Sequence, residues 1–228
     1  MHTARIMTKG SCIAFGVFLS LALLAPLSEA QFKITDNFNR ADGAPGLGWS
    51  PWGNGAQISG NQLETFGAFD VAGGIARTLD VTFPASFSFD FSTSAPSDGG
   101  WSISFNASNT TWTISSETAE IRLLQYSGSR EICTEFQTST GPSFVCGSTK
   151  SGQRDFTATA HVSGTVNADF SATVTLKYND GLLPASVTLK TTAPVGAIQT
   201  PLGSTFSFGN SNATNGPDFF DNFTLTLK

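Results

Sequence analysis

Strict alternation of apolar and polar side chains is the feature that most restricts how this chain can fold. In residues 87–92, Phe-Ser-Phe-Asp-Phe-Ser, it places phenylalanines on one face of a strand and polar groups on the other. Residues 101–106, Trp-Ser-Ile-Ser-Phe-Asn, repeat the pattern. The segment 93–100 between them contains Pro96 and Asp98-Gly99-Gly100, which favour a turn, so we expect a hairpin. One polar face of that hairpin would contain Ser88, Asp90, Ser92, Ser102, Ser104 and Asn106.

Period-two patterns recur along the rest of the chain, whereas an apolar stripe with helical spacing is not evident. Further strands are expected at residues 111–115, 120–126, 131–137, 143–146, 155–162, 168–178, 186–191, 204–208 and 219–227. The glycines from Gly43 to Gly60 and the pair Gly73-Gly74 are expected in turns between strands. Many short strands predict an all-β fold, an antiparallel two-sheet sandwich whose core is filled mainly by phenylalanine. Trp49 and Trp101 alternate with polar neighbours and are expected in that core.

The first 30 residues have the pattern of a secretory signal peptide. Arg5 and Lys9 precede an apolar run over residues 12–27, and Ser28-Glu29-Ala30 matches the cleavage site of signal peptidase. We therefore expect residues 31–228 to form a single mature domain, secreted or periplasmic. No later apolar run reaches the length of about 18 residues that a membrane-spanning helix needs.

Removal of the leader leaves two cysteines, Cys133 and Cys146. An even pair in an exported chain predicts one disulfide, with two unpaired buried thiols as the alternative. The formal net charge is −5, which argues against a nucleic-acid partner because such binding needs a basic surface.

The tripeptide Asp-Asn-Phe occurs near both ends of the mature chain, at residues 36–38 and 221–223. The stretches 36–43, 47–49 and 57–63 resemble the start of bacterial secreted domains of the concanavalin A-like lectin/glucanase superfamily, the laminin-G-like jelly rolls. The stretch around the second tripeptide is similar to the last strand of those domains. The resemblance implies a jelly-roll sandwich in which the first and last strands lie side by side.

No catalytic motif of that superfamily is present, because the Glu-any-Asp-any-any-Glu string of its family-16 glycosidases does not occur. Glu131 and Glu135 share a strand face, but their backbones lie about 13 Å apart, beyond the roughly 5 to 9.5 Å that paired glycosidase carboxyls need. A pair formed by Asp90 and an acid from a neighbouring strand stays open. His161 lies in an ordinary strand pattern without a nucleophile elbow, so we expect it on a strand surface.

Binding of a sugar needs a flat apolar surface for the ring and polar groups for its hydroxyls. Trp52 and Trp112 are flanked by turn or polar residues and are the candidate stacking platforms, although packing on a sheet edge explains both equally well. Asp90 and Asn106 on the expected polar face are the candidate partners for sugar hydroxyls.

A structural calcium ion is the one candidate cofactor, and the sequence does not require it. Asp36, Asp42 and Asp221 supply carboxylate oxygens near the terminal strands that the resemblance makes adjacent, and backbone carbonyls could complete the shell. Some members of the superfamily hold calcium in this region. Ordinary turns explain the same residues without a metal.

These features predict a secreted module that binds a polysaccharide or another glycan, or recognises a surface, without catalysis of its own. Two other classes stay open, since this architecture serves several functions. One is a polysaccharide-degrading enzyme, either a glycoside hydrolase or a polysaccharide lyase. The other is a structural or adhesive protein of the cell envelope.

Overall fold

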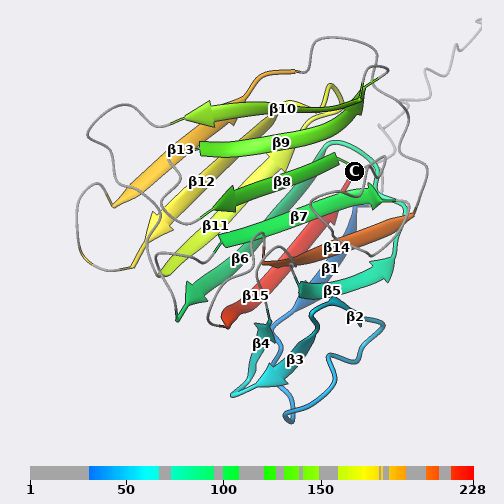
Figure 1. Cartoon of the computed structure of the whole chain (residues 1–228), viewed down its shortest axis with the longest axis vertical. Coiled ribbons are helices and arrows are strands. Elements are labelled where there is room, and N and C mark those ends of the chain that lie inside the picture. The colour runs from blue at the N-terminus through cyan, green and yellow to red at the C-terminus, as the bar shows by residue number, and fades with distance from the viewer. Residues whose placement is uncertain are drawn as a thin grey trace, which may run out of the picture.

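The computed structural model describes residues 31–66, 73–94, 100–107, 121–126, 131–138, 141–148, 159–179, 181, 185–193, 204–210 and 217–228. The described strands are antiparallel and form two sheets that pack face to face (Figure 1). Among the described residues there is no helix, and so none that could span a membrane. The prediction of an all-β sandwich is confirmed. The expected leader, residues 1–30, lies outside the described residues.

The larger sheet contains both ends of the domain, and we call it the terminal sheet. Its eight strands are β1 (Phe32–Asp36), β3 (Ala56–Ser59), β4 (Gln62–Thr65), β6 (Ala85–Thr93), β11 (Thr159–Val166), β12 (Ala172–Tyr178), β13 (Ser186–Thr191) and β15 (Asp218–Leu227). They follow the order β13-β12-β11-β6-β15-β4-β3, and β1 also pairs with β15.

The other sheet contains both cysteines, and we call it the disulfide sheet. Its seven strands are β2 (Ser50–Gly53), β5 (Gly73–Thr78), β7 (Gly100–Ala107), β8 (Ile121–Tyr126), β9 (Glu131–Thr138), β10 (Gly141–Ser148) and β14 (Thr205–Asn210). They follow the order β10-β9-β8-β7-β14-β5-β2.

The expected hairpin between segments 87–92 and 101–106 does not form, and this prediction is wrong. β6 belongs to the terminal sheet and β7 to the disulfide sheet. Their apolar rows face each other across the sandwich, where the ring centroids of Phe89 and Trp101 lie 5.4 Å apart. Alternation determines which side of a strand is buried, but rows placed face to face and rows placed side by side satisfy it equally. The expected polar face is therefore divided between two outer surfaces.

Phenylalanine fills the space between the sheets, as expected. Phe208 of β14 and Phe220 of β15 come from opposite sheets, and their ring centroids lie 4.6 Å apart in an edge-on arrangement. Such tilted pairs are favoured over flat sandwiches by the ring quadrupoles. Trp49 and Trp101 are both buried in the same core, which confirms their predicted place.

The pair Gly73-Gly74 begins β5 instead of forming the expected turn. Gly74 lies opposite Gly209 of β14, and a Cβ on Gly74 would overlap the carbonyl oxygen of Phe208 and lie 2.8 Å from the Cα of Gly209. Glycine is therefore needed here because two backbones approach closely.

The expected strand 186–191 is observed with these ends, and most of the other expected strands correspond to observed ones with shifted ends. The expected strand 168–178 begins only at Ala172, because Asn167 and Ser171 close a turn with a backbone hydrogen bond of 2.8 Å. The expected strand 155–162 is observed as Thr159–Val166. The expected strand 111–115 lies outside the described residues.

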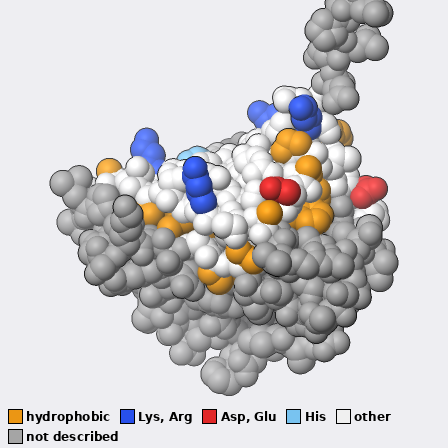
Figure 2. Space-filling model, turned by 90° about the horizontal axis from the view of Figure 1, so that it is seen from above, with side chains coloured by type: hydrophobic (Ala, Val, Ile, Leu, Met, Phe, Trp, Pro, Cys, Tyr) orange, Lys and Arg blue, Asp and Glu red, His pale blue; other side chains and the backbone are white. Residues whose placement is uncertain are grey.

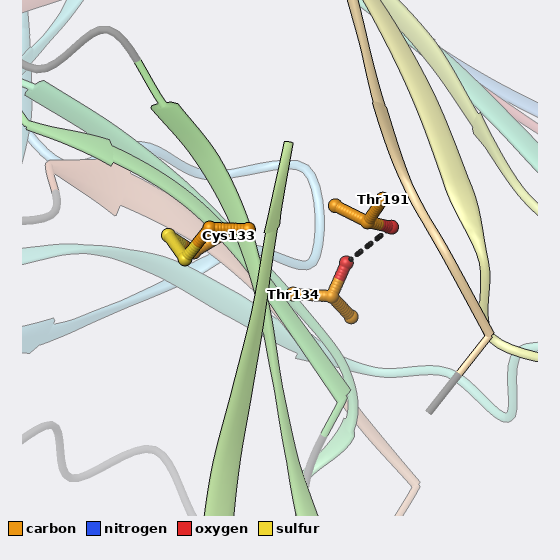
Figure 3. Close-up of a disulfide and its surroundings, with 4 residues drawn as sticks. Cys133, Thr134 and Thr191 are labelled. Carbon is orange, nitrogen blue, oxygen red and sulfur yellow. Dashed lines mark hydrogen bonds between the residues drawn. A yellow bond between two sulfur atoms is a disulfide. The ribbon is translucent and has the colours of Figure 1, made fainter. Parts of the chain in front are cut away.

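At one edge of the sandwich, β9 of the disulfide sheet contacts β13 of the terminal sheet (Figure 3). Cys133 of β9 and Cys146 of β10 are directly opposed and form a disulfide, which confirms that prediction. The next residue, Thr134, points the other way, and its buried hydroxyl donates to the Thr191 hydroxyl of β13 at 3.0 Å. The Thr191 oxygen also accepts the backbone N–H of Ala172. A buried hydroxyl pair therefore links the two sheets.

The first and last strands lie side by side, as the resemblance implies. β1 pairs with β15 in a register that sets Asp36 opposite Phe223. Phe38 and Phe223, the last residues of the two tripeptides, are both buried. The repeated tripeptide therefore reflects a shared environment at the end of two neighbouring strands.

Asp218 is buried at the start of β15, between Thr65 of β4 and Thr93 of β6. Burial raises the pKa of its carboxyl to about 7, although hydrogen bonds from the Thr93 side chain and the Gly100 backbone oppose the shift. Within the described part of the chain, Asp218 Oδ1 has no hydrogen-bond partner. The folded domain thus holds this proton more tightly than an unfolded chain does.

This raised pKa predicts a pH-dependent stability. The stabilising contribution of protonated Asp218 is lost as the pH rises from the ordinary value of 3.8 through about 7. The loss is at most about 4 kcal/mol, since one pKa unit corresponds to about 1.4 kcal/mol. We compare the melting temperature of D218N with that of the unmodified protein at the same pH. We expect the difference, D218N minus unmodified, to be distinctly more positive at pH 8 than at pH 4. D80N, which removes an exposed carboxylate, is the control and should show little such pH dependence. A D218N effect that is the same at both pH values would contradict the assignment.

Candidate functional site

The outer face of the terminal sheet carries a hydrogen-bonded network from three neighbouring strands. Asp90 of β6 is opposite both His161 of β11 and Asp221 of β15. Asp90 Oδ1 lies 2.7 Å from His161 Nδ1, and Asp90 Oδ2 accepts a hydrogen bond of 2.8 Å from Asn222 Nδ2. The side chains of His161 and Asp90 are 40% and 41% exposed, so solvent reaches the network. The expected surface position of His161 is confirmed.

A β-bulge in β15 brings Asn222 onto this face. The register between β15 and β6 shifts between Asp221 and Thr224, where β15 stops pairing with β4 and starts pairing with β1. Asn222 has a φ of 51°, a left-handed conformation that asparagine tolerates better than most residues. Neither Asp221 nor Asn222 is buried, whereas the phenylalanines on either side of them are. The bulge therefore directs two successive polar side chains outward.

Asp221 and Asp90 form a pair of carboxyl groups on directly opposed strand positions. Partial burial raises the pKa of Asp221, and the neighbouring carboxylates of Asp90 and Asp36 raise it further. The backbone N–H of Asn222 donates to Asp221 Oδ1 at 2.7 Å and opposes the shift. Opposed residues on one sheet face have Cβ atoms about 4.5 to 5.5 Å apart, so the two carboxyls are near neighbours.

Beside the network lies an open hollow of about 400 Å³, lined by residues of β1, β15 and the segment before β2. Asn37 and Asn222 contribute amide groups to its wall, and Leu47 contributes an apolar side chain. Leu47 is 72% exposed, which is unusual for a large aliphatic residue. It lies in a turn, Gly46-Leu47-Gly48, in which all three residues have positive φ. The hollow therefore combines amides with one exposed apolar group.

Asp36 anchors the segment that carries this turn. Its Oδ1 accepts the backbone N–H of Phe38 and a 2.7 Å bond from Arg40 Nη1, and its Oδ2 accepts bonds of 3.0 Å from Arg40 Nη2 and Trp49 Nε1. The Asp36 side chain is only 3% exposed. The carboxylate is therefore fully used in holding the chain on both sides of the turn.

The three candidate calcium ligands make other contacts in the described part of the chain, and calcium binding stays a prediction. Among the described residues, no three acidic, histidine or cysteine side chains form a group that could hold a metal ion. Asp36 is saturated by its protein partners, Asp42 is exposed and accepts the backbone N–H of Gly60, and Asp221 belongs to the Asp90 pair. The sequence did not reveal that Arg40, four residues after Asp36, supplies the positive charge beside this carboxylate.

Trp52 does not offer a stacking surface, because the side chain is only 4% exposed. Its indole packs against Ala76 and Gly74 of β5, and its Nε1 donates to the Ile75 carbonyl at 3.0 Å. The candidate role of Trp52 as a platform is therefore wrong, and the alternative of packing at a sheet edge is confirmed. Trp112 lies outside the described residues, so its role stays a prediction.

At the central strands β7 and β14 of the disulfide sheet, the outward-facing serines are buried. Ser102 and Ser104 of β7 and Ser207 of β14 have no exposed surface. Asn106 belongs to β7, but its side chain lies outside the described part, so its predicted contact with sugar hydroxyls stays untested. Of the two expected hydroxyl-binding residues, only Asp90 is placed at an open surface.

Charge is sparse on the surface that Figure 2 shows. The Lys and Arg side chains drawn in colour there stand apart from one another, and they do not form a continuous basic patch. The expectation that nucleic acid is not a partner stays a prediction.

Sequence reasoning missed three residues of this site. The sequence placed Asn222 in the repeated tripeptide but did not predict that its side chain points outward. That orientation comes from the bulge, which depends on the change of strand partner. The contact of His161 with Asp90 depends on strand order, which alternation does not reveal. Leu47 carried a usable signal, since an isolated leucine between two glycines is rarely a core residue.

Comparison with known proteins identifies the fold. No protein-family model matches the chain, and no curated protein matches it in sequence. A structure of basic winged bean lectin with Tn-antigen is 15% identical, covers 86% of this chain and 98% of its own, and has a TM-score of 0.56. Lectin I from Ulex europaeus, in complex with the methyl glycoside of α-L-fucose, is 12% identical over 86% of this chain and 97% of its own, with a TM-score of 0.55.

A Bacillus subtilis protein of unknown function with a galectin-like fold is 11% identical over 86% of this chain and 96% of its own, with a TM-score of 0.58. At these identities the likeness concerns the fold alone. The chain is a concanavalin A-like jelly roll, which confirms the resemblance seen in its terminal segments.

The Asp36 network predicts a large loss of stability when it is broken. We expect D36A to lower the free energy of unfolding by about 3 kcal/mol, because it leaves the Arg40 guanidinium and the buried Trp49 indole N–H without their acceptor. D42A removes an exposed carboxylate with one backbone partner and should cost less than about 1 kcal/mol. Urea denaturation of both variants measures the difference. Equal losses would show that Asp36 is not an anchor.

Proposed function

We propose that the chain is a secreted glycan-binding module without catalysis of its own, and that a saccharide docks in the hollow beside Leu47. The observation that carries the proposal is the exposed Leu47 side chain set among amide groups. Apolar C–H faces of sugar rings pack on apolar surfaces, while their hydroxyls need donors and acceptors close by.

The polar groups around the hollow support the proposal because they are held in place. Asn222 is oriented by its bond to Asp90, and Asp90 is in turn oriented by His161. Groups fixed before binding lose little conformational entropy when a ligand arrives. The hollow, at about 400 Å³, is within the size range of small-ligand sites.

Secretion is supported by the leader pattern and by the disulfide. Residues 1–30 resemble a signal peptide, and the Cys133–Cys146 bond is of the kind that persists in oxidising compartments. Two lectins with a similar fold have structures with Tn-antigen and with the methyl glycoside of α-L-fucose, and this adds support for a glycan partner.

The test is binding of the mature protein to an array of neutral and acidic glycans, followed by calorimetry on the ligands retained. L47N and N222G remove the side chains while keeping residues that accept positive φ. We expect each to weaken binding about tenfold, the effect of roughly 1.4 kcal/mol. F32N, which alters the other exposed large apolar residue, is the control and should bind normally.

Two results would overturn this proposal. One is binding that L47N and N222G leave unchanged, which would place the site elsewhere on the domain. The other is retention of no glycan combined with adhesion of the protein to cells or to itself, which would favour a structural or adhesive role.

A second candidate function is glycoside hydrolysis by Asp90 and Asp221. The specific observation is the pair itself, in which one carboxyl has a raised pKa and lies opposite a carboxylate that His161 and Asn222 hold. Glycosidases use two carboxyl groups in this way, one as acid and one as nucleophile or base. If it operates, reducing-sugar release from a polysaccharide panel should fall by at least about a hundredfold in both D90N and D221N. Release that persists in both variants, or no release by the unmodified protein, would exclude this pair.

A further inference from the structure

Arg77 of β5 is a cation without a counter-ion in the described part of the chain. Its guanidinium lies over the Trp49 ring, with Cζ 5.1 Å from the ring centroid. Its Nε is buried and has no hydrogen-bond partner among the described residues. Arg40, by contrast, forms an ion pair with Asp36. Within the described ranges, the Trp49 ring is the contact that holds the Arg77 guanidinium.

An unpartnered, half-buried guanidinium is costly, because water and hydrogen bonds are lost together. A cation–π contact offsets part of that cost and fixes the plane of the group. A guanidinium held in one plane matches the two oxygens of a carboxylate or sulfate in a bidentate way. The state of Arg77 is therefore that of a group prepared for an anion.

Space for such an anion adjoins Arg77. A hollow of about 190 Å³ is lined by Gly48, Ser50, Ala76, Arg77, Thr78 and Thr205. Three of these residues carry hydroxyls that can donate to an anionic oxygen. Gly48 lies directly beside the guanidinium, because a Cβ built on it would be 3.6 Å from Arg77 Nη2.

The two hollows are lined by successive residues of one turn, the first beside strands of the terminal sheet and the second beside strands of the disulfide sheet. Leu47 lines the hollow proposed for the sugar ring, and the next residue, Gly48, lines the hollow at Arg77. Trp49, the residue after that, is held by Asp36 on one side and contacts Arg77 on the other. A saccharide in the first hollow could therefore place an acidic substituent in the second by passing over this turn.

We propose that the module is selective for acidic saccharides, with Arg77 binding a carboxylate or sulfate group of the glycan. The inference rests on the proposed function and names its ligand class. The chain has a net charge of −5, so long-range charge does not attract a polyanion, and recognition of an acidic glycan rests on the local bidentate contact with Arg77.

The experiment compares acidic glycans with their neutral counterparts on the mature protein. The probes are oligogalacturonate and oligoalginate with their carboxyl-reduced forms, chondroitin sulfate with its desulfated form, and sodium sulfate alone. We expect at least one acidic form to bind about tenfold more tightly than its counterpart, and R77Q to abolish that preference. R77K keeps the charge without the planar fork and should retain only part of it. The uronate and sulfate arms show which group the site prefers.

S50L fills the hollow from β2 and leaves Arg77 in place, so it should also remove the preference. S50L is needed because R77Q could also disturb the packing on Trp49. Melting curves of each variant would reveal such a disturbance. Equal binding of acidic and neutral forms, or a preference unchanged in R77Q and S50L, would overturn the inference. Binding of sodium sulfate without binding of any acidic glycan would also overturn it.

The outcome for Arg77 is separable from that for the proposed function. Neutral glycans whose binding depends on Leu47, with no preference for acidic forms, would defeat only the inference. An acidic preference that needs Arg77 but not Leu47 would place the sugar outside the proposed hollow and defeat only that part of the proposed function.

Discussion

The carboxylate of Asp36 is the interaction on which the described surface features depend. It ends β1, and its two oxygens receive four donors, two of them from Arg40 and one from the Trp49 indole. Arg40 and Trp49 flank the turn that carries Leu47. One buried anion with a full set of partners therefore fixes the position of that turn. The turn then fixes where the two hollows beside it lie.

The last strand connects this anchor with the network at Asp90. β15 pairs first with β4 and then with β1, and the bulge between them turns Asp221 and Asn222 outward. Because β6 and β11 continue the same sheet, Asn222 meets Asp90 and Asp90 meets His161. Strand order thus converts residues far apart in the sequence into one surface. Asp218 and Asp221, close in sequence on β15, differ in burial and therefore in the degree to which their pKa values rise.

Alternation and chain topology contributed differently to what the sequence could predict. Alternation predicted the buried faces of β6 and β7, and the odd and even positions of Phe89 and Asp90 are as expected. The pair Cys133 and Cys146, and the adjacency of the terminal strands, were also predictable from an exported chain and a resemblance. The sheet that β7 joins was not, because it depends on where the connecting segment leads.

The site was harder to predict than the fold. Trp52 was expected at a surface because turn residues flank it, but Gly74 leaves room for its indole to pack on β5. Asp36 was expected as a calcium ligand, but Arg40 and Trp49 donate to its oxygens, a local pairing that composition does not disclose. Arg77 gave no pattern in the sequence, since its importance comes from a buried Nε that has no hydrogen-bond partner among the described residues. Contacts of this kind belong to tertiary structure.

The most direct test of the account is to map where a glycan touches the protein. Amide chemical shifts of the isotopically labelled mature domain would be followed during titration with the tightest ligand from the glycan panels. The account predicts that the largest changes cluster at Asn37, Leu47, Gly48, Arg77 and Asn222, on both sides of one turn. Changes confined to the outer face of the disulfide sheet, with none at this turn, would contradict it.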